Sequence, residues 1–96
     1  MLTIEAIKNI VRPICAKYGV ERLFLFGSYA RNEATEKSDV DLRVDRGKLR
    51  GFAFGGFYGD IEDALASSVD LLTTEQLQPH FLDRIKREEI LLYGKP

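Results

Sequence analysis

Residues 22–45 read RLFLFGSYARNEATEKSDVDLRVD, and this stretch decides the fold. It opens with a short apolar run at 22–26, which predicts a buried strand that ends at Gly27. It closes with an alternating run at 40–45, where apolar residues face one side of the expected strand and charged residues face the other. Two strands joined by a connection that begins with glycine therefore form the centre of the predicted fold.

The flanking segments add helices and a third strand to this centre. Residues 3–18 place apolar side chains at helical spacing, and the same spacing recurs in 60–67 and 79–92. A third apolar run, at 68–72, has the length and composition of a strand. The order of these elements predicts an α/β (α+β) protein in which a small mixed β-sheet is flanked by helices.

The stretch 46–59 is predicted as a loop. It contains five glycines, and each one weakens a helix by about 1 kcal/mol relative to alanine. Its aromatic residues form either an adaptable surface that contacts a partner or a nucleobase, or part of the core on the sheet. The core is favoured for Phe52 and Phe57, and both uses stay open for Phe54 and Tyr58.

Length and charge exclude several classes of protein. The chain has 96 residues, with 14 Lys+Arg against 15 Asp+Glu and a formal net charge of -1. A single domain, 1–96, fills this length, and the charge argues against a strong direct grip on nucleic acid. The lone cysteine, Cys15, excludes an internal disulfide and a cysteine zinc site. Without a bilayer-length apolar run or a signal-peptide pattern, the expected location is the cytoplasm.

The first chemical signal is the pair Gly27-Ser28 at the end of the first strand. A glycine there lets the backbone approach an anion closely, because free N–H groups favour phosphate and the Ser28 hydroxyl adds a donor. An ordinary turn between strand and helix, capped by Ser28, is the alternative. The pair by itself does not decide between the two.

The second chemical signal is a set of three aspartates. Asp39 and Asp41 share one face of the expected strand, with their Cα atoms about 6–7 Å apart. Asp70 interrupts the third apolar run and joins them if that strand lies alongside. Each aspartate alone has a plain explanation as a solvated strand residue. Together with the glycine-serine pair they form a layout suited to two-metal phosphoryl chemistry, since Mg²⁺ prefers carboxylate and phosphate oxygens.

The combined pattern resembles the GS-x10-D-x-D signature of the DNA polymerase β-like nucleotidyltransferase superfamily. Gly27-Ser28, a ten-residue spacer and Asp39-Val40-Asp41 match that signature. The string GSYARNEATEKSDVDL at 27–42, the later SVDLLT and the final LLYG are similar to its minimal nucleotidyltransferase (MNT) subgroup. The resemblance extends over almost the whole chain and implies the nucleotidyltransferase fold.

This resemblance implies a role for each matched residue. Asp39 and Asp41 would bind two Mg²⁺ ions, and Asp70 would bind the catalytic ion and favour deprotonation of the attacking hydroxyl. Gly27 and Ser28 would hold the triphosphate of ATP. The implied reaction is in-line attack on the α-phosphorus of a nucleoside triphosphate, with pyrophosphate leaving.

Arg31 lies one turn after Ser28 and has two interpretations. It contacts triphosphate oxygens, or it forms a structural ion pair with Glu33 or Asp39.

The resemblance also implies a biological role and a partner. MNT proteins are typically paired with a HEPN-domain ribonuclease toxin, which they silence by transferring AMP from ATP to one of its tyrosines. The implied function is an antitoxin adenylyltransferase of a type VII-like pair, in a hetero-oligomer with its toxin. Two alternatives stay open: a catalytically silent antitoxin that acts by binding alone, and nucleotidyl transfer to an RNA end or a small molecule.

Overall fold

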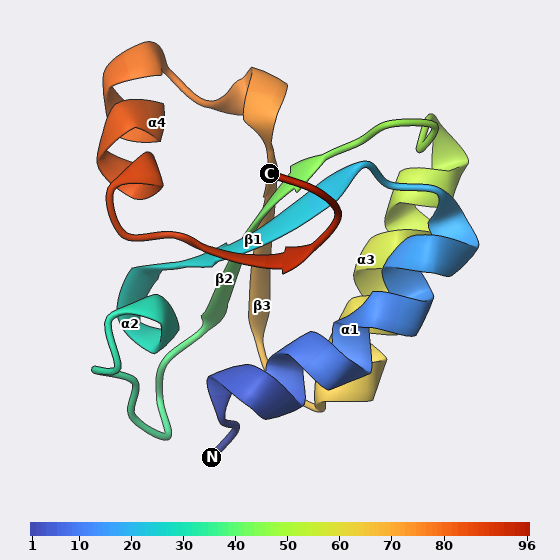
Figure 1. Ribbon diagram of the computed structural model, residues 1–96. Helices are drawn as coiled ribbons and strands as arrows, with labels where there is room; N and C mark the ends of the chain where they lie inside the picture. The colour runs from blue at the N-terminus through green and yellow to red at the C-terminus, as the bar shows by residue number, and fades with distance from the viewer.

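A computed structural model describes residues 1–96 as one four-stranded sheet with helices around it (Figure 1). The elements are α1 (Ile4–Tyr18), β1 (Arg22–Phe26), α2 (Gly27–Ala30), β2 (Val40–Asp45), α3 (Phe52–Leu65), β3 (Val69–Thr73), the 3-10 turn η1 (Thr74–Gln76), α4 (Pro79–Lys86) and β4 (Ile90–Tyr93). The strand order is β3-β2-β1-β4. Strand β1 is antiparallel to both neighbours, whereas β2 and β3 are parallel. The predicted mixed sheet of an α+β fold is confirmed.

The core lies between one face of this sheet and the helices α1 and α3, which run side by side (Figure 1). Val40, Leu42 and Val44 of β2 are fully buried in it, so the predicted alternation of this strand is confirmed. Helix α4 packs against the opposite face, where the rings of Phe26 and Phe81 meet edge to face. The charged residues of β2 are thus left on the same face as α4.

Helix α3 corrects the prediction of a loop over 46–59. The helix begins at Phe52 and includes three of the five glycines. Its buried residues Phe57, Ile61 and Leu65 recur every four positions, and burial of this apolar stripe outweighs the weak helix propensity of glycine. Core packing is confirmed for Phe57, whereas the expectation was wrong for Phe52, which is fully exposed.

The C-terminal segment corrects a second prediction. Helical spacing was expected over 79–92, but α4 ends at Lys86 and residues 90–93 form β4. Strand β4 pairs with β1, whose backbone would otherwise present an open edge, and it buries Leu92 in the core. The closing of this edge explains why four apolar residues leave the helical pattern.

Two residues outside the site have plain structural roles. Cys15 is fully buried in α1, and burial raises the pKa of its thiol to about 12, which makes it an inert core residue. His80 is exposed at the start of α4. No helix of the structure combines the length and the apolar character that a membrane crossing needs.

Candidate active site

Gly27 stands where β1 ends and α2 begins. Its φ of +74° lies in the left-handed region, which glycine adopts without strain. A β-carbon at this residue would collide with the carboxylate of Asp41. The backbone of the β1–α2 turn therefore lies directly against a side chain of β2, and only glycine fits there.

Two of the three predicted acids are neighbours on the face of the sheet that carries α4. Asp41 of β2 and Asp70 of β3 are direct partners in the parallel register, so their side chains lie next to each other. Asp39 is exposed just before β2 begins, two residues from Asp41. Strand pairing thus brings together Asp41 and Asp70, which are 29 positions apart in the chain.

The pKa of Asp41 reflects the neighbouring negative charges. Burial, together with the negative charges of Asp70 and Asp39, raises the pKa of the Asp41 carboxyl to about 6. The guanidinium of Arg31 acts in the opposite direction. A carboxylate that is desolvated and repelled by its neighbours favours a proton or a cation.

This donor set fits a divalent cation in its chemistry. Mg²⁺ takes one or two carboxylates together with phosphate oxygens and water, and carboxylates are what the three aspartates offer. No three acidic or histidine side chains already form a closed metal cluster. Asp39 and Asp70 are exposed and free to turn, so the fit depends on the donors rather than on preformed geometry.

A pocket of about 350 Å³ opens beside Asp41. Its walls come from the end of β1, from α2, from β2 and from α4, and they include Gly27, Ser28, Arg31 and Asp41. All three predicted nucleotide-binding residues therefore line the same pocket as one predicted metal ligand. The roles of these residues in binding stay predictions that rest on this shared location.

Arg31 faces the pocket from just after α2, where it is bound by two acids. Its Nε donates to Glu33 at 2.8 Å, and its Nη1 lies 3.1 Å from each carboxylate oxygen of Glu88. The predicted ion pair with Glu33 is thus confirmed, whereas none forms with Asp39. Because the guanidinium also lines the pocket, contact with a phosphate stays a prediction.

Glu88 is a residue of this pocket that sequence reasoning missed. It belongs to a run of charged residues at 86–89, which is typical of a solvated helix face. The helix stops at Lys86 instead, and the carboxylate of Glu88 accepts the Gly27 N–H at 3.3 Å. Nothing in the local sequence distinguishes it, because its partners are about 60 residues away.

The next residue, Glu89, is anchored in a buried ion network. Its oxygens accept from Nη2 and Nε of Arg43 at 2.7 and 3.0 Å. Arg43 is only 3% exposed, and its guanidinium lies over the ring of Phe24, 4.1 Å from the centroid. This network fixes the α4–β4 loop to β2, and thereby places Glu88 beside the pocket.

Tyr58 of α3 forms hydrogen bonds to β3, the strand that carries Asp70. Its hydroxyl donates to the Val69 carbonyl at 2.7 Å and accepts the Leu71 N–H at 3.3 Å. Both groups lie on the outer edge of β3, on either side of Asp70. The open question about this aromatic residue is answered by a structural role, since it fixes the backbone that carries the third acid.

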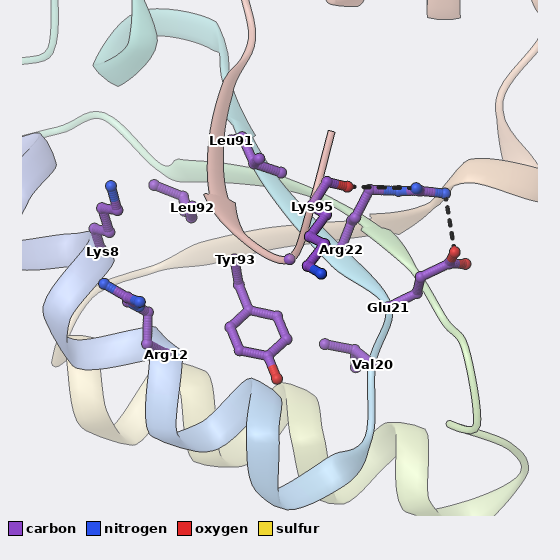
Figure 2. Close-up of a pocket in the computed structure, with 10 residues that line it drawn as sticks. Lys8, Arg12, Val20, Glu21, Arg22, Leu91, Leu92, Tyr93 and Lys95 are labelled. Carbon is purple, nitrogen blue, oxygen red and sulfur yellow. Dashed lines mark hydrogen bonds and ion pairs between the residues drawn. The ribbon is translucent and has the colours of Figure 1, made fainter.

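A larger pocket, of about 590 Å³, lies at the other end of β1 between α1 and β4 (Figure 2). Its polar lining is mainly basic, with Lys8 and Arg12 reaching in from α1 (Figure 2). Arg22 in its wall bonds to Asp45 at 2.7 Å. This pocket contains none of the predicted site residues and no pair of carboxylates, so the smaller pocket is the candidate for metal-dependent chemistry.

Comparison with known proteins identifies the family of the chain. The family described as "Polymerase beta, Nucleotidyltransferase" matches residues 8–96. MJ0435 of Methanocaldococcus jannaschii, a candidate protein adenylyltransferase, is 38% identical over 90 residues, which cover 93% of this chain and 97% of MJ0435. Protein adenylyltransferase MntA of Thermococcus cleftensis is 33% identical over 95 residues, which cover 94% and 96% of the two chains.

Solved structures give the same result. A candidate minimal nucleotidyltransferase is 32% identical and has a TM-score of 0.79, with 91% of this chain and 90% of the other covered. A toxin–antitoxin crystal structure with AMP-PNP has a TM-score of 0.76 at 22% identity, over 92% of this chain and 73% of the other, which shows a shared fold. The family match over residues 8–96 and the full-length relatives show that the chain belongs to the polymerase β-type nucleotidyltransferase family.

Proposed function

We propose that this protein is an antitoxin that transfers AMP from ATP to a tyrosine hydroxyl of a HEPN-domain toxin. The observation that carries this proposal is the pairing of Asp41 with Asp70 at the pocket that contains Gly27 and Arg31. The relatives that match along their full length and are called protein adenylyltransferases support a protein as the acceptor. The HEPN toxin and its tyrosine are what the MNT resemblance implies.

Each residue of the site has a task in this reaction. Asp39, Asp41 and Asp70 are the residues that would hold Mg²⁺, which neutralises charge on the attacking and leaving oxygens when bound. The Gly27 N–H, the Ser28 hydroxyl and Arg31 would bind the triphosphate. The tyrosine oxygen forms a bond to the α-phosphorus, the bond to pyrophosphate breaks, and the tyrosine proton leaves with help from Asp70.

The shape of the site supports a macromolecular acceptor. Asp39 and Asp70 are exposed to solvent, so a hydroxyl on a second protein has access to them. The acceptor would therefore bring its own surface, as a protein partner does.

The test is the intact mass of the HEPN toxin after incubation with this protein, ATP and Mg²⁺. We expect the toxin to gain the mass of one or more AMP groups. The Asp39→Asn and Asp41→Asn double variant should abolish this gain. Asp63→Asn, an exposed acid on α3 outside the site, serves as the matched control and should leave the gain intact.

The other outcomes identify the alternatives. If the double variant still binds and silences the toxin while no mass is gained, this protein is an antitoxin that acts by binding alone. If the toxin stays unmodified while ATP is consumed in the presence of RNA or a small hydroxyl compound, the acceptor is of that class. Either result would overturn protein adenylylation.

A further inference from the structure

The carboxylate of Glu88 accepts hydrogen bonds from the groups to which a phosphate of the substrate would bind. One of its oxygens accepts the Gly27 N–H at 3.3 Å, and both lie 3.1 Å from Nη1 of Arg31. The Glu88 side chain is 29% exposed and forms part of the pocket wall. A backbone N–H and a guanidinium are the donors that proteins use for phosphate oxygens.

We propose that Glu88 is an internal stand-in for a substrate phosphate, which the triphosphate must displace, and that Glu88 thereby sets the affinity for ATP. This inference rests on the proposed function, because it takes the pocket to be the triphosphate site. It adds a residue that controls substrate affinity and that the family signature does not contain.

Charge supports this role. A carboxylate and a phosphate oxygen compete for the same donors, so only one of them can hold the Gly27 N–H at a time. The negative charge of Glu88 also acts on Asp41, which places it within the field of the acids. An incoming triphosphate would therefore find these donors already hydrogen-bonded, and it would be repelled by the negative charge of Glu88.

The surroundings of Glu88 allow its side chain to leave without loss of the loop. The backbone N–H groups of Glu88 and Glu89 donate to the Ile85 carbonyl at 3.0 and 2.9 Å, so the loop is fixed independently of the carboxylate. Arg31 keeps its 2.8 Å bond to Glu33 when Glu88 turns away. Displacement thus needs a side-chain rotation and leaves the guanidinium oriented toward the pocket.

The test compares Glu88→Gln with the wild-type chain. Glutamine keeps the length of the side chain and an acceptor for the Gly27 N–H, but it lacks the charge that pairs with Arg31. Glu62→Gln, at an exposed residue of α3 without an ion pair, is the matched control. Calorimetry measures the Kd of α,β-methylene-ATP with Mg²⁺, an analogue that cannot be cleaved between its α- and β-phosphates.

We expect Glu88→Gln to bind the analogue about three- to fivefold more tightly, the range set by a half-exposed ion pair. Glu62→Gln should leave the Kd unchanged. An unchanged or weaker affinity in Glu88→Gln would overturn the proposal, because Glu88 would then serve to orient Arg31. Glu88→Ala further separates competition with the phosphate from orientation of Arg31. It should tighten binding if the carboxylate competes with the phosphate, and weaken it if the carboxylate orients Arg31.

A spectroscopic measurement tests the site without nucleotide transfer. In the ¹⁵N–¹H spectrum of the free protein, the Gly27 amide should shift in Glu88→Gln but not in Glu62→Gln. Tripolyphosphate added to the wild-type protein should move the same amide. If wild type binds the analogue at Gly27 but Glu88→Gln gains nothing, only this inference fails; if neither protein binds it, the proposed function fails as well.

Discussion

The carboxylate of Asp41 fills the space that a β-carbon at residue 27 would need. The glycine of the β1–α2 turn and the second acid of β2 are therefore one steric unit, although they come from different elements. The spacing of the signature reflects this contact: residues 28–38 lead the chain from the turn to the start of β2, so that the acid returns to the glycine. Each of the two residues limits what the other position accepts.

Gly27→Ala should abolish nucleotide transfer and destabilise the protein by about 1–3 kcal/mol. The added methyl group would displace the Asp41 carboxylate, and the positive φ of this residue would strain any side chain. Urea unfolding and the toxin mass assay measure the two effects. Gly59→Ala is the control, because its β-carbon meets open space in α3 and should stabilise the protein by about 0.5–1 kcal/mol. Equal activity in both variants would disprove the steric argument.

Asp41→Asn should raise the melting temperature at pH 7.5 while it removes activity. The folded-state pKa of Asp41, about 6, lies above the value of about 4 in the unfolded chain, so the folded protein disfavours the charged form. The neutral carboxyl contributes fully to the stability of the fold below pH 4, and this contribution is lost as the pH rises through the folded-state pKa of about 6. The gain from asparagine should accordingly shrink toward pH 4. A lower melting temperature of the variant at pH 7.5 would contradict this reasoning.

Asp45→Asn should have the opposite sign. Burial alone would raise the pKa of Asp45, but hydrogen bonds from Thr74 and Arg22 and the charge of Arg43 outweigh it and lower the pKa. Its ionised form therefore stabilises the fold above the unfolded pKa of about 4, and this contribution is lost as the pH falls through the folded value. Thermal unfolding at pH 7.5 should show the variant less stable than wild type, with a smaller deficit in acid.

Arg43→Ala should destabilise the protein by about 3–5 kcal/mol, because it leaves Glu89, whose side chain is only 10% exposed, without its cation. Unfolding in urea measures this loss. Replacing both residues together, with methionine and leucine, should lose much less, since no charge is then left buried. The more exposed pair of Arg46 with Glu75 provides the comparison, and Glu75→Gln should change the stability by at most about 1 kcal/mol. Similar losses in the two pairs would refute the distinction.

Tyr58→Phe should weaken β3 locally by about 1–2 kcal/mol and slow nucleotide transfer. The hydroxyl satisfies the Val69 carbonyl and the Leu71 N–H on an open strand edge, and phenylalanine leaves both without it. Amide exchange at Leu71 should accelerate in this variant. Tyr18→Phe removes a hydroxyl bound to Asp60 on α3 and should leave exchange at Leu71 unchanged. Unaltered exchange in Tyr58→Phe would show that the strand edge does not depend on the hydroxyl.

Local patterns predicted the centre of the fold and the acids of the candidate site. The alternation over residues 40–45 is a period that only a strand uses, so it fixed which face of β2 is buried. The same period places Asp41 on the polar face, and the pairing of Asp70 with it follows once the two strands are parallel neighbours. Such features depend on residues that are close in the chain or in one register.

The features that escaped prediction depend on distant partners. Helix α3 forms despite its glycines because Phe57 and Ile61 have a core to enter, and local propensity carries no information about that core. Strand β4 forms because β1 has an open edge. Glu88 contacts the Gly27 backbone only after the helix stops and the loop turns back, which a run of charged residues does not announce.

The adjacent carboxylates of the α4–β4 loop connect the pocket directly with the buried ion network. Glu89 is fastened to the sheet through Arg43, and Glu88 reaches the pocket from the neighbouring peptide unit. A change in the Arg43–Glu89 ion pair would therefore shift Glu88, the adjacent residue, and with it the wall of the pocket. The loop is therefore intolerant of changes in length: one inserted or deleted residue would move one carboxylate into the place of the other and leave the second place without a carboxylate, whereas the side chain of Arg87 beside them is exposed.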